Sequence, residues 1–443
     1  MNPFVGRLIK SSALALFVKI AGAFLSYVMF VALARAMTLE QFGYFSFSFS
    51  ISVILAKVAV AGQQQVMLRD IARRSTDDTD KQERELITMR SYTTVLLISL
   101  ILMIALLGYV AAQSNYAPAL SWSLVVAALF IPVMAFSELQ TSILRAYESV
   151  VLGLAPREII WRVLVCILGF GIMLSLGPVL TAPVGFGLCA FFLAAATLGQ
   201  SCAAPGTRFW RCAHEWSRLR DKDWLKISAQ FSVSTIVTFG APMLSVVIIG
   251  VFLSPVESGA FFAALKSSQT INLVLMATNI IASPLISRHF WKNEMVHVQL
   301  VCSYCAGAGT IFAILVFFLF AIAGHSVLGV FGEGYDTAYP ELLILSVGYI
   351  FNAACGPNGA ILEMTKHQHR FMRLILFSNI LGVIALPVLT YFFGTIGAAS
   401  AVSGTLILWN FLAAHAAIKH AHINPTIFGI WRGMALGKKE DAS

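Results

Sequence analysis

The stretch from Ser91 to Ser137 reads SYTTVLLISLILMIALLGYVAAQSNYAPALSWSLVVAALFIPVMAFS, 47 residues without an Asp, Glu, Lys or Arg. A membrane-spanning helix needs about 20 apolar residues, so one straight helix of this length would overshoot the bilayer about twofold. The polar, proline-containing segment 113–118 interrupts the stretch near its middle, where a turn is expected. The sequence therefore predicts two membrane-spanning helices joined by a short turn.

Two further charge-free stretches repeat this pattern. They run over 163–207 and 374–418, each 45 residues long. Gly177-Pro178 with Pro183 divides the first, and the glycines at 394 and 397 divide the second. Six more apolar stretches each fit one helix: 11–35, 40–68, 227–252, 256–287, 298–330 and 338–362. We therefore predict an all-α polytopic membrane protein with 12 transmembrane helices.

The composition of the whole chain points to the same class. Of its 443 residues, 58% are hydrophobic and only 12% are charged, whereas soluble domains carry about 25% charged residues. Such a chain has too little polar surface to cover a water-soluble globule, which argues against a soluble enzyme.

The Lys and Arg residues indicate how the chain lies in the membrane. With the N-terminus inside, 26 of the 30 fall in inner segments, among them 69–90, 145–162 and 208–226, and one, Arg35, falls in an outer loop. Because cytoplasmic loops are enriched in Lys and Arg, both termini are predicted to be cytoplasmic. The net charge of +9 then reflects inner loops that face an anionic leaflet, so we expect no nucleic-acid partner.

A weak internal repeat, at an offset of 216 residues, suggests two similar halves. Thr38-Leu39-Glu40-Gln41 aligns with Ser254-Pro255-Val256-Glu257, and each segment has the form of a helix N-cap. Two six-helix halves that begin and end on the same side must be parallel repeats. The predicted organisation is an N-terminal bundle over 1–203, a basic amphipathic cytoplasmic linker over 204–226, a C-terminal bundle over 227–420 and a cytoplasmic tail over 421–443.

Three lysines fall inside predicted helices, namely Lys19, Lys57 and Lys266. An ammonium group inside the bilayer costs several kcal/mol unless it meets protein, water or an anion. One interpretation is a cationic lining of a cavity between the halves, suited to an anionic substrate. The alternatives are snorkelling of Lys57, or a buried pair with an acid such as Glu138, the only acid expected deep inside a helix.

A polar stripe lies on the predicted helix that carries Lys266. Ser268, Asn272 and Asn279 recur at spacings of four and seven, which is one helical face. Such a stripe can hydrogen-bond to sugars, so Asn272 is a candidate substrate-binding residue, although helix–helix contacts in membranes use the same residue types. In the tenth predicted helix, the segment 355–359, CGPNG, predicts a kink.

No motif for a cofactor or metal ion stands out. The seven Cys and nine His form no paired set with zinc-ligand spacing, and the chain has no G-x-x-x-x-G-K-[ST] motif for binding ATP. We therefore expect neither a cofactor, a metal ion nor ATP.

Two segments resemble a known family. The segment 32–44, ALARAMTLEQFGY, looks like the end-of-first-helix signature of Wzx-type polysaccharide flippases, and 330–338, VFGEGYDTA, followed by LLIL at 342–345, resembles their outer motif. The resemblance covers about residues 5–420. It identifies the polysaccharide-transporter branch of the MOP superfamily, and implies a MATE-like fold with two six-helix bundles around a central cavity.

The resemblance also implies a function and a site. Members of the family move polyprenyl-diphosphate-linked oligosaccharides, so the chain is expected to be a bacterial inner-membrane flippase. Its expected cargo is an undecaprenyl-diphosphate-linked O-antigen, exopolysaccharide or capsule repeat unit, carried to the periplasmic leaflet by alternating access, with a polymerase or ligase as a candidate partner. In the related lipid II flippases, cationic residues on helices 1, 2 and 8 are important cavity positions, and Lys19, Lys57 and Lys266 occupy those helices here.

Two other functions fit the same topology. A MATE-type multidrug or cation antiporter shares the fold class but needs buried carboxylates, and three intramembrane lysines against one glutamate favour an anionic substrate. A polysaccharide polymerase or ligase needs catalytic residues in a substantial outer loop, and the longest predicted outer loop, about 324–337, offers no nucleophile–base pair. We therefore expect a transporter and not an enzyme.

Overall fold

The computed structural model describes residues 3–72, 78–113, 117–147, 149–204, 228, 232, 242–365 and 367–429. Every regular element in these ranges is helical, and the chain is an all-α polytopic membrane protein, as predicted. Within the same ranges, nine helices are long and apolar enough to cross a membrane, or ten if one bent pair counts as a span. Large apolar side chains such as Ile322 and Leu174, 86% and 81% exposed, lie on the outside, where lipid covers them.

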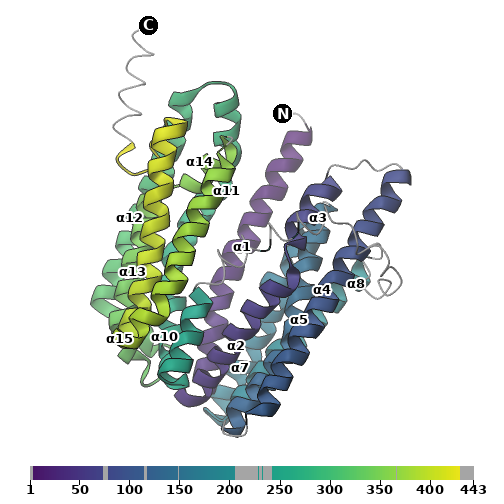
Figure 1. Cartoon of the computed structure of the whole chain (residues 1–443), viewed down its shortest axis with the longest axis vertical. Helices are drawn as coiled ribbons and strands as arrows, with labels where there is room; N and C mark the ends of the chain where they lie inside the picture. The colour runs from purple at the N-terminus through teal and green to yellow at the C-terminus, as the bar shows by residue number, and fades with distance from the viewer. Residues whose placement is uncertain are drawn as a thin grey trace. The chain divides into compact units, whose positions relative to one another are not determined.

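The chain forms two compact units, residues 1–250 and 251–443. In unit 1, α2, α4 and α5 run side by side (Figure 1). The described helices of unit 1 include α1 (Pro3–Ala36), α2 (Leu39–Val60), α3 (Gln63–Ala72), α4 (Asp78–Ala112), α5 (Pro118–Ala146), α6 (Val150–Ala155), the π-helical turn η1 (Pro156–Ile160), α7 (Trp161–Leu176) and α8 (Ala182–Ala203).

Unit 2 is a second helical bundle, in which α12, α13 and α15 pack side by side (Figure 1). Its described elements are α10 (Pro255–Ser268), the 3-10 turn η5 (Gln269–Ile271), α11 (Asn272–Trp291), α12 (Met295–Gly329), the 3-10 turn η6 (Tyr335–Ala338), α13 (Tyr339–Ala354), α14 (Asn358–Met364), α15 (Gln368–Ala416) and the π-helical turn η7 (Ala417–Ala421).

The three turns predicted within the charge-free stretches are confirmed. α4 ends at Ala112 and α5 begins at Pro118, and α7 ends before Gly177, whose φ is 76°. α15 is continuous by its hydrogen bonds, but Gly394 has φ 61° and ψ −142° inside it. A Cβ on Gly397 would lie 1.9 Å from the carbonyl oxygen of Leu389, so the chain folds back tightly at this point.

The two predicted helix caps are also present. The Thr38 hydroxyl accepts a hydrogen bond from the Gln41 amide at 3.3 Å, and the Ser254 hydroxyl accepts one from the Glu257 amide at 3.2 Å. Both cap residues have extended backbones, as an N-cap requires. The short repeated sequence therefore starts two helices, α2 and α10, by the same local mechanism.

Aromatic side chains fill the core of unit 1 beside the Thr38 cap. Phe45 and Phe49 on α2 surround Phe186 on α8, with ring centroids 5.5 and 6.0 Å away, and Phe130 on α5 lies 5.1 Å from the same ring. All four side chains are buried. Inside a bilayer the hydrophobic effect does not drive helices together, because the lipid tails are as apolar as the side chains. Close aromatic contacts of this kind therefore help to hold these helices together.

The predicted kink in the tenth helix is confirmed. α13 and α14 meet at an angle of 42°, and Gly356 between them has φ 60°. The break frees the carbonyl oxygen of Ala354, which accepts a hydrogen bond from the amide of Ile427 at 3.0 Å. In an unbroken helix this carbonyl oxygen would accept a hydrogen bond from the next turn. Here the segment that follows η7 supplies the donor instead.

Most of the predicted inner segment 145–162 is helical. The chain is helical again from Val150, and Val151–Leu176 is one helix that is long and apolar enough to span a membrane. Arg157 and Arg162 lie in this helix, and their side chains pair with Glu138 and Glu158 inside unit 1.

The domain boundaries remain a prediction. The expected linker 204–226 lies outside the described residues except for Ala204, and so does half of the expected seventh helix, 227–252. Its described part, the apolar helix Pro242–Phe252, packs against α2, since a Cβ on Gly250 would lie 2.2 Å from the Phe47 ring. The boundary between the two units accordingly follows Gly250.

Candidate functional site

Charged side chains from five helical elements gather inside unit 1. We call them the buried charge network: Lys19 on α1, Lys57 on α2, Glu138 on α5, Arg157 and Glu158 on η1, and Arg162 on α7. Among the described residues of unit 1, these four cations face two carboxylates, so the six side chains together carry two more positive than negative charges when all are ionised.

The first part of the network is centred on Glu158. Lys19 donates a hydrogen bond to one of its carboxylate oxygens at 2.7 Å, and Arg162 donates to the other at 2.9 Å. The Lys19 side chain is 36% exposed and that of Glu158 only 10%. Lys19 is therefore the more accessible partner of a buried carboxylate.

Gly22 allows α1 to approach this carboxylate closely. Its carbonyl oxygen accepts a hydrogen bond from Arg162 at 2.6 Å. A Cβ at this position would lie 2.8 Å from the Cβ of Glu158 and 3.0 Å from Nη1 of Arg162. Small residues such as glycine let membrane helices approach closely. Gly22 lies one turn from Lys19 on α1, so this close approach brings Lys19 within reach of Glu158.

The second part of the network is centred on Glu138. Its carboxylate contacts Lys57 and lies 3.7 Å from Nη2 of Arg157. The Glu138 side chain is 4% exposed, while those of Lys57 and Arg157 are each 17% exposed. The pairing of Lys57 with Glu138, which was one of the two alternatives for this lysine, is confirmed.

A π-helical turn connects the two parts. Arg157 and Glu158 are neighbours on η1, and they face different partners, Glu138 and Lys19 respectively. π-helical turns are rare and occur often at functional sites, because they turn side chains away from their regular helical positions. Here η1 joins charges from α1 and α5 into one network.

Sequence reasoning missed three members of the network, Arg157, Glu158 and Arg162. They lie in the segment 145–162, outside the apolar stretches of the sequence and therefore outside the predicted helices. The spacing of Glu158 and Arg162 is i,i+4, a typical helical ion-pair spacing, and they do pair at 2.9 Å. That spacing, followed directly by an apolar run, is the signal in the sequence that the helix begins earlier than hydropathy indicates.

A second polar cluster lies in unit 2, at the break between α10 and α11. Lys266 in the last turn of α10 donates to the Gln269 side chain at 3.3 Å, and its ammonium group lies 5.1 Å from the centre of the Phe262 ring. Asn272 begins α11, and its side-chain oxygen accepts a hydrogen bond from the side-chain amide of Asn352 at 2.9 Å. The 3-10 turn η5 separates the two candidate residues, and such a turn inside a long helix often marks a hinge.

Three side chains where α11 ends and α12 begins have the composition of a metal site. Ligand atoms of His289, Glu294 and His297 lie within 4.8 Å of one another. His289 contacts the Glu294 carboxylate, and this hydrogen bond holds the pKa of the Glu294 carboxyl below its ordinary value. The contact between His289 and Glu294 and the stacking of the two imidazole rings, 5.2 Å apart, hold these side chains together.

Solved structures share the fold of the whole chain. An inward-facing multidrug resistance MATE family transporter of the MOP superfamily aligns with a TM-score of 0.71 and 12% identity, over 95% of this chain and 96% of that one. The lipid II flippase MurJ, in an inward closed conformation, aligns with a TM-score of 0.71 and 15% identity, over 92% and 87%. At these identities, the likeness is one of fold.

Relatives by sequence point to glycan assembly. A probable low-salt glycan biosynthesis flippase, Agl15 of Haloferax volcanii, is 27% identical over 184 residues, which are 41% of this chain and 39% of that protein. The match thus spans about two fifths of that relative's length. The family described as polysaccharide biosynthesis protein matches residues 8–290. Because this region is well over half of the chain, the protein belongs to that polysaccharide biosynthesis family.

Proposed function

We propose that the protein is a flippase that moves a polyprenyl-diphosphate-linked oligosaccharide from the cytoplasmic to the outer leaflet of a bacterial inner membrane by alternating access. The cargo we favour is an undecaprenyl-diphosphate-linked repeat unit of O-antigen, exopolysaccharide or capsule. A polymerase or ligase that uses the translocated unit is the expected partner. Family membership supports the class of cargo, and the charges inside unit 1 support its chemistry.

The observation that carries the proposal is the excess of positive charge in the buried charge network. Among the described residues, four cations meet two carboxylates in this network, and the negative charge of a diphosphate suits such a set. Lys19 has the most exposed side chain of the network, so it is the group that a head group would reach first. Lys57 is more deeply buried, and we assign it to holding Glu138 and adding to the positive potential.

In unit 2, we propose that Lys266 and Asn272 bind the same cargo. Lys266 is half-buried beside the Phe262 ring, and Asn272 lies next to a helix break. A lysine suits a phosphate oxygen, whereas an asparagine side chain can both donate to and accept from a sugar hydroxyl. The turn η5 provides a place where α10 and α11 can change their angle during transport.

The distribution of charge in unit 2 supports a cytoplasmic location for the C-terminal end of this unit. The start of α12, α14 and both ends of the α15–η7 segment share one core, and this end of the unit carries Arg288, Lys292, Arg370, Arg373 and Lys419. At the other end α10 packs on η6, and the charged residues there are Glu257, Glu333, Asp336 and Glu341. By the positive-inside rule, the basic end faces the cytoplasm.

A cation antiporter of the MATE type is the alternative that the shared fold keeps open. The structure adds one carboxylate, Glu158, to the buried charges, but it also adds Arg157 and Arg162. The described members of the network are four cations and two acids, so their net charge is positive. The sequence also predicts a positive net charge, from three lysines and one glutamate. A drug cation would meet net repulsion at this site.

The proposal can be tested by deleting the gene in its host and measuring lipid-linked oligosaccharides by mass spectrometry. We expect an undecaprenyl-diphosphate-linked oligosaccharide to accumulate on the cytoplasmic side and surface glycan to be lost. Wild-type protein should restore export, whereas Lys19→Ala with Lys266→Ala should not. Lys292→Ala, which removes an exposed lysine outside both clusters, is the matched control.

Two results would contradict the proposal. Unchanged surface glycan after deletion would exclude a flippase of this pathway. Loss of drug resistance instead of glycan would assign the protein to the antiporters. Protein amounts in the membrane must be equal among the variants, because a misfolded variant would mimic a transport defect.

A further inference from the structure

A groove on unit 2 shares no residue with the buried charge network or with the cluster around Lys266. Its volume is about 530 Å³, and it is lined only by α15 and η7. We call it the α15 groove. Its basic lining side chains are Arg370, Arg373, His415, Lys419 and His420.

The groove forms between two antiparallel arms of the same helix. Gly394 reverses the chain inside α15, so the first arm returns along the second. The arms touch at Gly382, where a Cβ would lie 2.2 Å from the Thr405 hydroxyl. Arg370, on the first arm, and Lys419, on η7, both lie further toward the basic end of the unit.

Each arm presents one face to the groove. On the first arm, Arg370, Arg373 and Phe377 are separated by three and four residues, and on the second, Leu412, His415 and Lys419 have the same spacing. Residues at these intervals lie on one side of a helix. The two faces therefore oppose each other across the groove, and each has basic residues at one end and an apolar residue at the other. No Asp or Glu is among the described residues that line the groove.

The position of these side chains along the arms is characteristic of a membrane boundary. Arg370, Arg373 and Lys419 flank the stretch 374–418, which has no charged residue. Leu374, Phe377 and Leu412, which also line the groove, lie inside that stretch. The groove is therefore cationic at the level of the lipid head groups and apolar at the level of the acyl chains.

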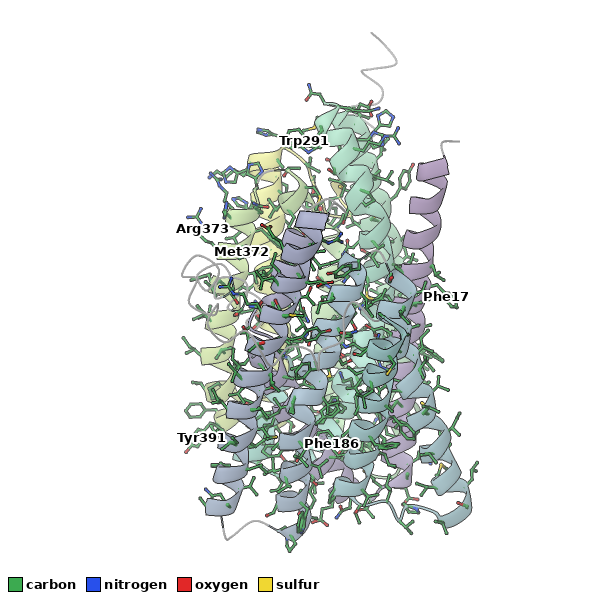
Figure 2. All side chains as sticks on the ribbon, turned by 90° about the vertical axis from the view of Figure 1, so that its right-hand side faces the viewer. Phe17, Phe186, Trp291, Met372, Arg373 and Tyr391 are labelled. Atoms are coloured by element: carbon green, nitrogen blue, oxygen red, sulfur yellow. The ribbon has the colours of Figure 1, made fainter. Side chains whose placement is uncertain are left out.

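A tryptophan marks the same level of unit 2. Trp291 at the end of α11 is 59% exposed, and Trp is enriched at membrane–water interfaces. Figure 2 shows Arg373 toward the same end of the unit as Trp291, and Tyr391 toward the opposite end. The basic part of the groove thus lies where phosphate groups of a bilayer are found.

We propose that the α15 groove binds an acidic phospholipid, with its phosphate between the arginines and Lys419 and an acyl chain along Phe377 and Leu412. Basic pockets between membrane helices on the cytoplasmic side suit anionic head groups. Phe377 is 59% exposed, and such an apolar lining favours a lipid over a free phosphate ion. The lipid would hold the two arms of α15 together where η7 has a widened π-helical turn.

The test uses the full chain purified in a neutral detergent. Phosphatidylglycerol is titrated in mixed micelles, with phosphatidylcholine and inorganic phosphate in parallel, and binding is followed by native mass spectrometry and by the thermal unfolding midpoint. We expect phosphatidylglycerol alone to bind and to raise the midpoint. The double variant Arg370→Gln, Arg373→Gln should weaken its apparent affinity by about tenfold or more, since each basic residue near an anionic lipid surface contributes about as much as a threefold to fivefold change.

The matched control is Arg288→Gln, Lys292→Gln, which removes two exposed cations at the same end of unit 2 but outside the groove. It should bind phosphatidylglycerol as the wild type does. Equal losses in the two double variants, or equal binding of phosphatidylcholine, would overturn the proposal. So would an equal stabilisation by inorganic phosphate, which would assign the groove to a free anion. If the Arg370, Arg373 variant does not fold, Lys419→Gln alone must show the same selective loss.

Discussion

Lys19 on α1 and Glu158 on η1 are 139 residues apart in the chain, and their side chains meet at 2.7 Å inside unit 1. Glu158 also binds Arg162, so one carboxylate serves two cations from different helices. Removing the acid therefore has a larger effect than removing either base. This asymmetry separates the structural role of the network from a role in transport.

We expect Glu158→Gln to destabilise the protein strongly. Breaking a buried ion pair by removing one partner lowers the free energy of unfolding by about 3–5 kcal/mol, because the remaining charge is left without compensation. Lys19→Ala should lower it much less, since Glu158 keeps Arg162 and the Lys19 side chain is 36% exposed. Equilibrium unfolding in mixed micelles measures both values, and Glu257→Gln, in the exposed first turn of α10, is the control.

The same measurement combined with glycan export distinguishes stability from function. If Lys19 binds the diphosphate, Lys19→Ala loses export while it keeps most of its stability, and Lys19→Arg retains export. If Lys19 only holds α1 against η1, export should follow stability in all three variants. That result would remove Lys19 from the proposed site.

The close approach at Gly22 gives a second prediction. In Gly22→Ala the new Cβ meets the Glu158 side chain, so α1 must move away and the ion pair to Lys19 must lengthen. We expect a lower free energy of unfolding, by about 1–3 kcal/mol for overpacking. Gly171→Ala on α7 is the control, because nothing lies within 4 Å of its Cβ position. It should be neutral or slightly stabilising, and a loss equal to that of Gly22→Ala would contradict the assigned contact.

The two helix caps make a third prediction. Thr38→Ala and Ser254→Ala should each lower the free energy of unfolding by about 1 kcal/mol, since each hydroxyl satisfies a first-turn amide. Thr181 also begins a helix, α8, but its side chain makes no cap hydrogen bond. Thr181→Ala should therefore have a smaller effect than the other two. Equal losses at all three positions would mean that the caps contribute nothing specific.

The sequence predicted those features that follow from local chemistry and from the thickness of the bilayer. The turn at Gly394, the caps at Thr38 and Ser254 and the kink at Gly356 all depend on residues within a few positions of one another. Lipid excludes unsatisfied backbone, so an apolar run of 45 residues had to contain a turn. These rules require no knowledge of which helices are neighbours.

The candidate site could be predicted only in part, because it depends on which helices pack together. The sequence identifies Lys19 and Lys57 as unusual, but a charge inside a membrane helix says nothing about the partner that compensates it. Glu158 lies between Arg157 and Arg162, in a charged stretch that the sequence predicts as part of an inner segment. Its contact with Lys19 requires α1 to pack on η1, and Gly22 is the residue that permits this approach.

The pair formed by Asn272 and Asn352 allows a last test of the cluster in unit 2. The Asn352 amide, 7% exposed, donates to the side chain of Asn272, which is only half-buried. If the pair only joins α11 to α13, Asn272→Ala and Asn352→Ala should lower stability by similar amounts, about 1–3 kcal/mol, and should affect export alike. We expect instead that Asn272→Ala reduces glycan export several-fold more than Asn352→Ala when both are compared at equal amounts of folded protein, because Asn272 alone has accessible surface for a sugar hydroxyl. Equal export by the two variants would reduce Asn272 to a helix–helix contact and leave Lys266 as the remaining candidate of that cluster.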